Sequence, residues 1–142
     1  MSQIIRDITE ISRCGAQYQA ETFADMGLKS CHASYLLEIC AHPGISQDQL
    51  ASRICFNKSN IARQAAALEE NGLLRRVPSL EDKRVLELYP TQKALELLPQ
   101  ITARLGQWEA LLTQDITEEE TAALEALLLR MRARAAAWME AH

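Results

Sequence analysis

The chain has 142 residues and a mass of 15.9 kDa, and 48% of its side chains are apolar, which suits one globular domain with a substantial core. Aromatic residues make up only 5%, while Leu, Ala, Glu and Arg are abundant, so a mostly helical fold is expected. No uncharged apolar run reaches the roughly 18 residues of a membrane span. Asp7 and Glu10 lie where a signal peptide would be basic and then apolar, so we expect a cytoplasmic protein without membrane association.

The formal net charge of −4 argues against nucleic acid as a partner, but the distribution of charge argues the other way. Residues 52–84 carry a net charge of +3, and the rest of the chain carries −7. A basic middle between acidic ends fits a segment that faces phosphate groups. Chance clustering of charge on a solvated surface accounts for the same numbers equally well.

The cysteines lie at positions 14, 31, 40 and 55 and form no CxxC pair, so we expect reduced thiols rather than disulfides or a zinc ribbon. Zinc binding deserves a test, because Cys31, His32, Cys40 and His42 are suitable ligand types close in sequence. On a helix, however, Cys31 and Cys40 point to opposite sides, since each residue turns the chain by about 100°. We therefore expect no metal and no other cofactor.

The first predicted helix carries a single apolar stripe. Ile4, Ile8 and Ile11 are followed at helical spacing by Gly15 and Tyr18. This helix is expected to end near residues 26 and 27, where a glycine favours a left-handed stop.

Two shorter helices should follow. Ser30 is expected to cap the first of them, which runs to the His-Pro-Gly break at residues 42–44. Ser46 and Gln49 form a capping box that opens the next, with Leu50 and Ile54 on its buried face.

The fourth predicted helix begins at residue 57 and ends at Gly72. One of its sides is polar and suited to contact a partner molecule. Ile61, Ala65 and Leu68 would be buried on its other side. With the preceding helix it forms a helix-turn-helix, whose second helix enters a DNA major groove. There Asn and Gln can pair with adenine, and Arg with guanine. The predicted contact residues of this helix are Lys58, Ser59, Asn60, Arg63 and Gln64.

After Gly72 the pattern changes from helical to strand-like, with two apolar-rich runs on either side of a polar turn at residues 78–82. This pattern predicts a β-hairpin. A hairpin that follows a recognition helix is a wing, which contacts the DNA backbone or the minor groove. Its predicted contact residues are Asp82, Lys83 and Arg84, and Asp82 should hold Arg84 through a charge-assisted hydrogen bond.

These segments resemble the multiple-antibiotic-resistance regulator (MarR) family of winged-helix repressors, and the likeness extends over essentially the whole chain. The family signature is an LExxG sequence, a D-x-R wing and a closing L-T-x-x-G. Pro90 stands in place of the family's Leu and Ala94 in place of its closing Gly, so the join between the wing and the next helix is expected to differ. The resemblance implies a repressor that binds double-stranded DNA. The matching residues are Leu68, Glu69, Gly72, Asp82, Arg84 and Thr91.

Two more apolar stripes occupy the C-terminal third, and Thr117 with Glu120 forms a capping box between them. Pro99 should kink or break the first of these helices near Leu98. Two unpaired apolar stripes need a partner surface, so we expect a homodimer in which these helices intertwine with the first helix of a second subunit. The alternative is a monomer in which these helices fold back to form a core. The stripes consist of Leu98, Ile101, Leu105, Trp108 and Leu112, and of Leu124, Leu127, Leu128, Met131, Ala135 and Trp138.

The expected fold class is therefore mostly α (α+β), a winged helix-turn-helix with dimerisation helices at both ends. An N-terminal dimerisation helix would span residues 1–29. The winged helix-turn-helix DNA-binding domain would span residues 30–92, and C-terminal dimerisation helices would span residues 93–142.

The resemblance also implies a small aromatic or anionic effector that binds between the dimer helices and the DNA-binding lobe. Candidate residues for that pocket are Arg13, Tyr18, His32 and Tyr35, although Tyr35 and His32 fit equally well as core residues. A redox-responsive regulator that uses Cys14 is a further alternative, because a branch of the family senses hydroperoxide with a cysteine on this helix. A buried and inert thiol is the simpler interpretation of Cys14.

An enzyme is not expected. The sequence has no GxSxG and no glycine-rich phosphate loop, and its histidines, at positions 32, 42 and 142, suggest no nucleophile–base pair. The better alternative is a winged-helix protein-interaction module without DNA binding. Such a module has no need for the pair of Asp82 and Arg84 or for a basic middle segment.

Overall fold

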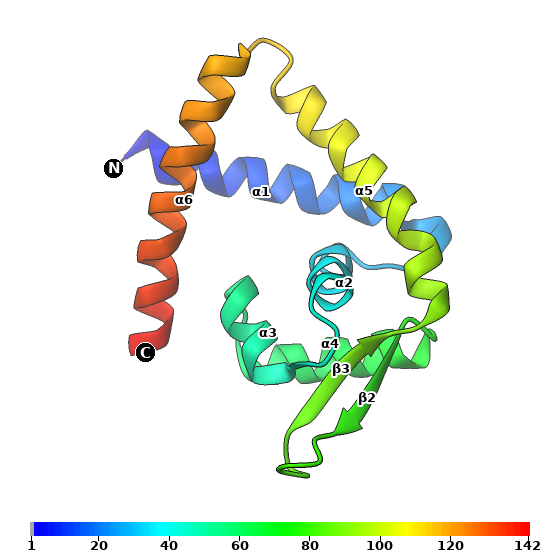
Figure 1. Ribbon diagram of the computed structural model, residues 1–142. Coiled ribbons are helices and arrows are strands. Elements are labelled where there is room, and N and C mark those ends of the chain that lie inside the picture. The colour runs from blue at the N-terminus through cyan, green and yellow to red at the C-terminus, as the bar shows by residue number, and fades with distance from the viewer. Residues whose placement is uncertain (1) are drawn as a thin grey trace.

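The computed structural model describes residues 2–142, and it consists of a compact winged lobe from which long helices extend (Figure 1). Met1, the first residue of the predicted dimerisation segment, lies outside the described residues. The lobe contains, in chain order, α2 (His32–Ala41), β1 (Ile45–Ser46), α3 (Gln47–Ile54), α4 (Lys58–Glu70), β2 (Leu74–Pro78) and β3 (Leu86–Pro90). The elements outside it are α1 (Gln3–Thr22), the short 3-10 helix η1 (Ala24–Met26), α5 (Gln92–Leu112) and α6 (Glu118–Ala141).

Three helices begin at side-chain caps, and two of these caps, at Ser46 and Thr117, are the predicted ones. The Ser46 hydroxyl accepts a hydrogen bond from the Gln49 backbone N–H at 3.1 Å, and the Gln49 side chain accepts one from the Ser46 N–H at 3.0 Å. Thr117 and Glu120 form the same reciprocal pair at the start of α6. Asn57 caps α4. Each cap satisfies backbone donors that have no partner within the helix.

The predicted Ser30 cap is wrong. Helix α2 begins at His32, and Cys31 holds the capping position without a side-chain hydrogen bond. The Nδ1 atom of the His32 ring instead accepts a hydrogen bond from the Lys29 backbone N–H at 3.1 Å. The imidazole thus fixes the chain as it enters α2, in place of a serine hydroxyl.

The hairpin forms as predicted, and the structure adds a strand that the sequence did not indicate. Strands β2 and β3 pair antiparallel, with Arg76 opposite Leu88, and the two-residue β1 pairs with the other edge of β3. Just before β1, Gly44 has a φ of 90°, and a Cβ built there would lie 3.3 Å from the Tyr89 hydroxyl. Glycine is therefore required where the chain turns onto the sheet, which anchors the base of the wing.

The hydrophobic core lies inside the winged lobe and beneath the start of α5. The buried side chains of α4 are Ile61, Ala65 and Leu68, as predicted, and α5 contributes Ala94 and Ile101. The other fully buried large apolar residues are Phe23, Tyr35, Leu36, Ile39, Leu50, Leu73, Leu74 and Leu88.

Helix α5 passes through Pro99 without the predicted break and remains one helix from Gln92 to Leu112. Pro99 leaves the Leu95 carbonyl without its helical donor, but both residues are exposed, so water can satisfy that oxygen. No helix among residues 2–142 is both long enough and apolar enough to cross a membrane.

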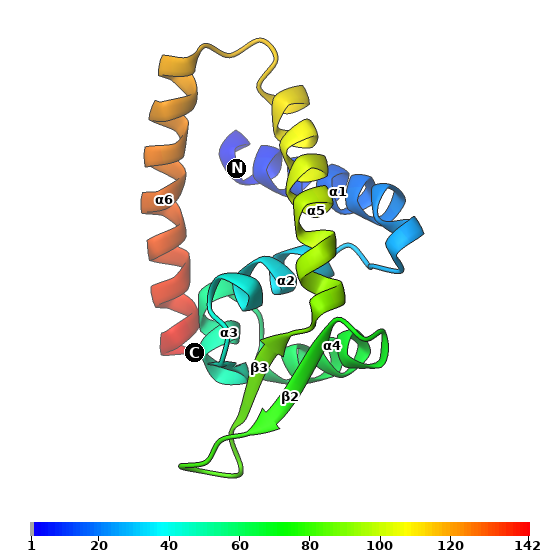
Figure 2. The ribbon, with the colours of Figure 1, turned by 45° about the vertical axis from the view of Figure 1, so that its right-hand side comes forward.

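Helix α6 contains no buried residue, and its C-terminal half approaches the lobe through a hydrogen bond from Arg132 to the Arg53 carbonyl and one from Ser52 to Glu140 (Figure 2). Leu127 and Trp138 of its apolar stripe are 53% and 61% exposed. Helix α6 therefore does not fold back to form a monomeric core, the alternative to a dimer, whereas the start of α5 packs on the core of the lobe.

Candidate nucleic-acid interface

Helices α3 and α4 are joined by a tight turn at residues 55–57. Cys55 ends α3 in the left-handed backbone conformation, with a φ of 57°. The Asn57 side chain then accepts a hydrogen bond from the Asn60 backbone N–H at 2.8 Å and starts α4. This is the predicted helix-turn-helix, with α4 as its second helix.

The N-terminal half of α4 presents polar side chains to solvent. Lys58, Ser59 and Arg63 are exposed, and Asn60 is half-buried. Arg63 Nη2 donates to Asn60 Oδ1 at 3.2 Å, which keeps the guanidinium beside the amide. Four of the five predicted contact residues therefore lie together on this side of the helix.

The fifth, Gln64, is engaged with the core. Its Oε1 lies 2.8 Å from Nε2 of His32, which is only 1% exposed. Burial, the largest effect, lowers the pKa of His32 below its usual value, so the neutral ring is favoured. The predicted contact residue is thus attached to α2 through its amide oxygen.

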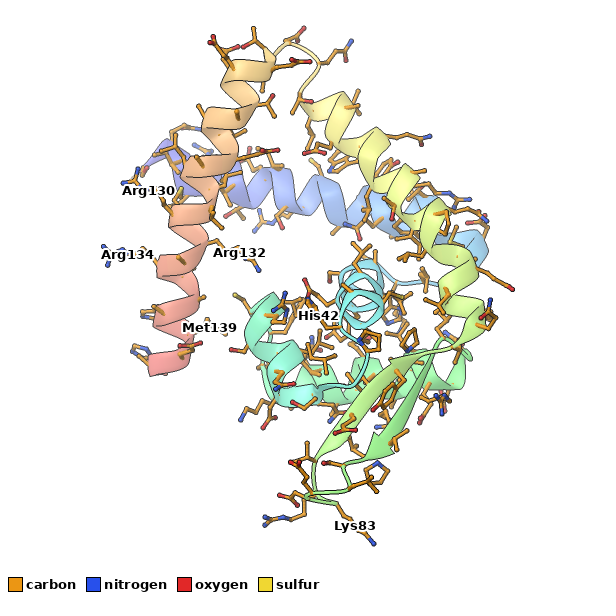
Figure 3. The ribbon with its side chains drawn as sticks, in the orientation of Figure 1. His42, Lys83, Arg130, Arg132, Arg134 and Met139 are labelled. Atoms are coloured by element: carbon orange, nitrogen blue, oxygen red, sulfur yellow. The ribbon has the colours of Figure 1, made fainter. Side chains whose placement is uncertain are left out.

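The wing holds its arginine as predicted. Arg84 Nε and Nη2 donate to the two carboxylate oxygens of Asp82 at 3.1 and 3.2 Å, and the Arg84 backbone N–H donates to Oδ1 at 3.0 Å. The side-chain bond to Arg84 is the largest of the effects that lower the pKa of Asp82. The Arg84 side chain remains 90% exposed, and Lys83 extends from the hairpin tip (Figure 3). The wing therefore offers two cations to a phosphate backbone or a minor groove.

The wing is also attached directly to α4. Glu69 accepts two hydrogen bonds from the Arg76 guanidinium, at 3.0 and 3.1 Å, and one from the Arg76 backbone N–H at 2.8 Å. The backbone bond is the leading cause of the lowered pKa of Glu69. Because Glu69 lies on α4 and Arg76 on β2, this contact fixes the recognition helix and the wing relative to each other.

Known proteins resemble this chain in sequence and in fold. The MarR family model matches residues 30–86. The curated protein YybA of Bacillus subtilis (strain 168), an uncharacterised HTH-type transcriptional regulator, is 30% identical over 132 residues, which are 93% of this chain and 88% of that protein. The chain belongs to the MarR family.

Solved MarR-type structures agree along nearly the whole chain. The transcriptional regulator SlyA has a TM-score of 0.93 at 27% identity, with 98% of both chains covered. A MarR family protein from Listeria monocytogenes, solved in complex with a 26mer DNA, has a TM-score of 0.92 at 27% identity, covering 98% of this chain and 93% of that one.

The join between the wing and α5 contains both departures from the MarR signature and is closed by Thr91. Strand β3 ends at Pro90, and the Thr91 hydroxyl accepts from the Ala94 backbone N–H at 3.3 Å, which caps α5. The same hydroxyl donates to the Gly72 carbonyl at 2.6 Å. Ala94 is buried, so its methyl group packs into the core where the family has glycine.

The four candidate effector residues do not line a common pocket. Arg13 is exposed, and Tyr18 stacks on Trp108 at 4.8 Å and donates to the Arg104 carbonyl at 2.7 Å. His32 and Tyr35 are buried in the lobe, and burial raises the pKa of Tyr35 to about 12. Tertiary burial, which sequence spacing does not report, removes these two rings from any accessible surface.

A groove of about 460 Å³ lies between α1 and the start of α2, and none of these four residues lines it. Its walls include Ile11, Gly15, Cys31, Ser34, Phe56 and Trp108. Cys14, the candidate redox residue, is an exposed free thiol on α1, so its expected burial is wrong, and it does not line this groove.

Sequence reasoning missed two contacts that organise the interface. The bonds between His32 and Gln64 and between Glu69 and Arg76 join different elements. In the sequence Glu69 stands out only as part of the family signature, and its separation from Arg76, which lies beyond the end of the helix, indicates no pairing. Gln64 lies at the edge of the polar side of α4, next to the buried side, and this position was the available sequence signal for a contact with the core.

Proposed function

We propose that the protein is a sequence-specific transcriptional regulator, acting as a repressor, that binds a pseudo-palindromic operator as a homodimer. The observation that carries the proposal is the arrangement of α4 and the wing. The exposed hydroxyl and guanidinium groups and the half-buried Asn60 amide on α4 are suited to base edges, and the exposed Arg84 is suited to phosphate or the minor groove. The DNA complex of the Listeria relative supports this assignment.

In this proposal, residues 30–92 form the domain that binds DNA, while residues 1–29 and 93–142 form the dimer. The exposed apolar residues of α1 and α6 support the second part, because a dimer would cover them. Two recognition helices related by a dyad would read half-sites about 10 base pairs apart, roughly one turn of DNA.

We further propose that a small aromatic or anionic effector occupies the groove between α1 and α2. This groove supports the proposal because Phe56, which lies in the turn of the helix-turn-helix, is one of its walls. A ligand there would touch both the dimerisation helix and the DNA-binding lobe.

The test separates base contacts from backbone contacts. Arg84→Ala should weaken operator and random DNA alike and lower the slope of log affinity against log salt concentration by roughly one, because one phosphate contact is lost. Asn60→Ala and Arg63→Ala should lower preference for operator over random DNA, by about tenfold for each good base contact. Asp82→Ala should be a milder Arg84→Ala, since it removes both an orienting partner and a negative charge.

Fluorescence anisotropy across a salt series, with operator and random duplexes, measures all four variants. The operator is first obtained by genome-wide mapping of bound sites. If Arg84→Ala leaves both affinities unchanged, the hairpin does not bind DNA, and the protein-interaction module becomes the better assignment.

A further inference from the structure

The contact between His32 and Gln64 has a defined direction. The Lys29 backbone N–H donates to Nδ1 of His32, so Nδ1 carries the lone pair and the ring proton of the neutral imidazole lies on Nε2. Nε2–H then donates to Gln64 Oε1 across 2.8 Å. A backbone donor therefore determines, through one imidazole, which end of the Gln64 amide turns inward.

The other end of the amide is free. The Gln64 amide nitrogen makes no hydrogen bond within residues 2–142 and is not among the buried unpartnered atoms, so its two N–H groups can reach solvent or ligand. Asn60 lies one helical turn earlier on the same side of α4. Gln64 therefore presents donors next to a residue proposed to read bases.

This orientation conflicts with the usual pairing of glutamine and adenine. That pairing uses the amide oxygen for the adenine N6 amino group and the amide nitrogen for N7, so both must face one base. In this chain the oxygen faces a side chain that is 1% exposed. Guanine, by contrast, offers two adjacent acceptors, O6 and N7, in the major groove.

We propose that His32 is a positioning residue that holds the Gln64 amide oxygen inward, so that only the amide N–H donors face DNA. Gln64 then selects guanine rather than adenine in each half-site. The inference rests on the proposed DNA-binding function and specifies its base recognition. His32 touches no DNA in this arrangement. It acts through the direction in which it holds the amide.

The experiment measures the affinity of the wild-type protein for operators changed at each base pair of a half-site, and repeats the series with Gln64→Ala. We expect one guanine at which wild-type discrimination is strong and falls by about tenfold in the variant. Replacing that guanine with 7-deazaguanine should weaken wild-type binding and leave Gln64→Ala unaffected. Gln107→Ala, an exposed glutamine on α5, is the matched control and should keep the wild-type profile.

His32→Phe tests the positioning role. It removes both ring nitrogens, frees the Gln64 oxygen and should make adenine tolerated at that same position while other positions keep their preferences. Nitrogen NMR of the imidazole in wild-type protein gives a readout that does not depend on whether this variant folds. It should show a protonated Nε2 and an unprotonated Nδ1.

Three results overturn the proposal. One is a Gln64-dependent preference for adenine that is lost when purine, which lacks the N6 amino group, replaces it. Another is specific operator binding in which Gln64→Ala changes no base preference. The third is an imidazole protonated on Nδ1. If wild-type protein shows no sequence preference at all, the proposed function itself fails, and that outcome differs from all three.

Discussion

His32 shows how one buried side chain can take on several structural tasks. Its ring accepts from the Lys29 backbone at the start of α2 and donates to Gln64 on α4. A protonated ring would carry hydrogen on both nitrogens, so it would lose the bond from Lys29 and leave two donors facing each other. The neutral ring is therefore the form that the fold accommodates.

This arrangement predicts a pH-dependent stability. Burial, and to a smaller extent the nearby Lys29 charge, lowers the pKa of His32 below 6.5, so near that pH the unfolded chain binds a proton that the folded chain does not. The contribution of His32 to the free energy of unfolding is present in full above pH 6.5. It is lost as the pH falls from there through the folded-state pKa.

Urea unfolding at fixed protein concentration, from about pH 8 down to about pH 5, measures this effect. The wild-type free energy of unfolding should decline on the acid side, and His32→Phe should decline less steeply. His142→Gln, at an exposed position at the end of the chain, should follow the wild-type slope. Equal slopes for wild type and His32→Phe would show that another group causes the acid sensitivity.

At the scale of elements, the contact between Glu69 and Arg76 connects the two parts that are proposed to bind DNA. Replacing Glu69 with Ala removes two guanidinium bonds and leaves the Arg76 backbone N–H without its acceptor. Because both side chains are partly exposed, we expect a loss of about 1 kcal/mol in the free energy of unfolding. The wing should also become less well fixed relative to α4.

Glu69→Ala should therefore weaken DNA binding without changing base preference, as measured by anisotropy with operator variants. Glu70→Ala is the control, because Glu70 is the exposed neighbour on the same helix and carries the same charge. A change of base preference in Glu69→Ala would mean that Glu69 shapes the α4 surface itself rather than the position of the wing.

The elements also show which features the sequence could predict. The helical period of α4 predicts the burial of Ile61, Ala65 and Leu68, and the three are buried. The pairing of Asp82 with Arg84 is local, so two residues of spacing were enough to predict it. Periodicity and capping work where the determining contacts lie within a few residues.

The incorrect or missing predictions concern features that are determined by residues distant in the sequence or by a different side chain. Strand β1 has two residues and therefore no period, and it exists because β3 pairs with it. Ser30 was expected to cap α2, but the His32 ring serves there instead. Gln64 belongs to the polar side of α4 by sequence, yet its partner lies 32 residues earlier in the chain.

At the scale of the whole molecule, the single chain leaves large apolar residues in solvent at both ends. Ile4 and Ile5 of α1 are each 59% exposed, and Leu127 and Trp138 of α6 are similarly open. The basic side chains of α6 are arranged around this helix, with Arg130 and Arg134 directed away from the lobe and Arg132 donating to the Arg53 carbonyl at 2.9 Å (Figure 3). Large apolar residues that are exposed in this way are typical of helices whose partner is another chain.

The proposed dimer predicts a difference between two exposed leucines. Leu127 lies in the α6 stripe and is 53% exposed, whereas Leu80 lies in the wing and is 99% exposed. Leu127→Asp would place a charge in the proposed interface, so we expect it to yield monomers in sedimentation velocity at micromolar concentration. Operator affinity should then fall by more than tenfold, because each lobe must bind its half-site alone. Leu80→Asp should remain dimeric. A wild-type protein that sediments as a monomer, or a Leu127→Asp variant that remains a dimer, would show that the α6 stripe is covered in some other way.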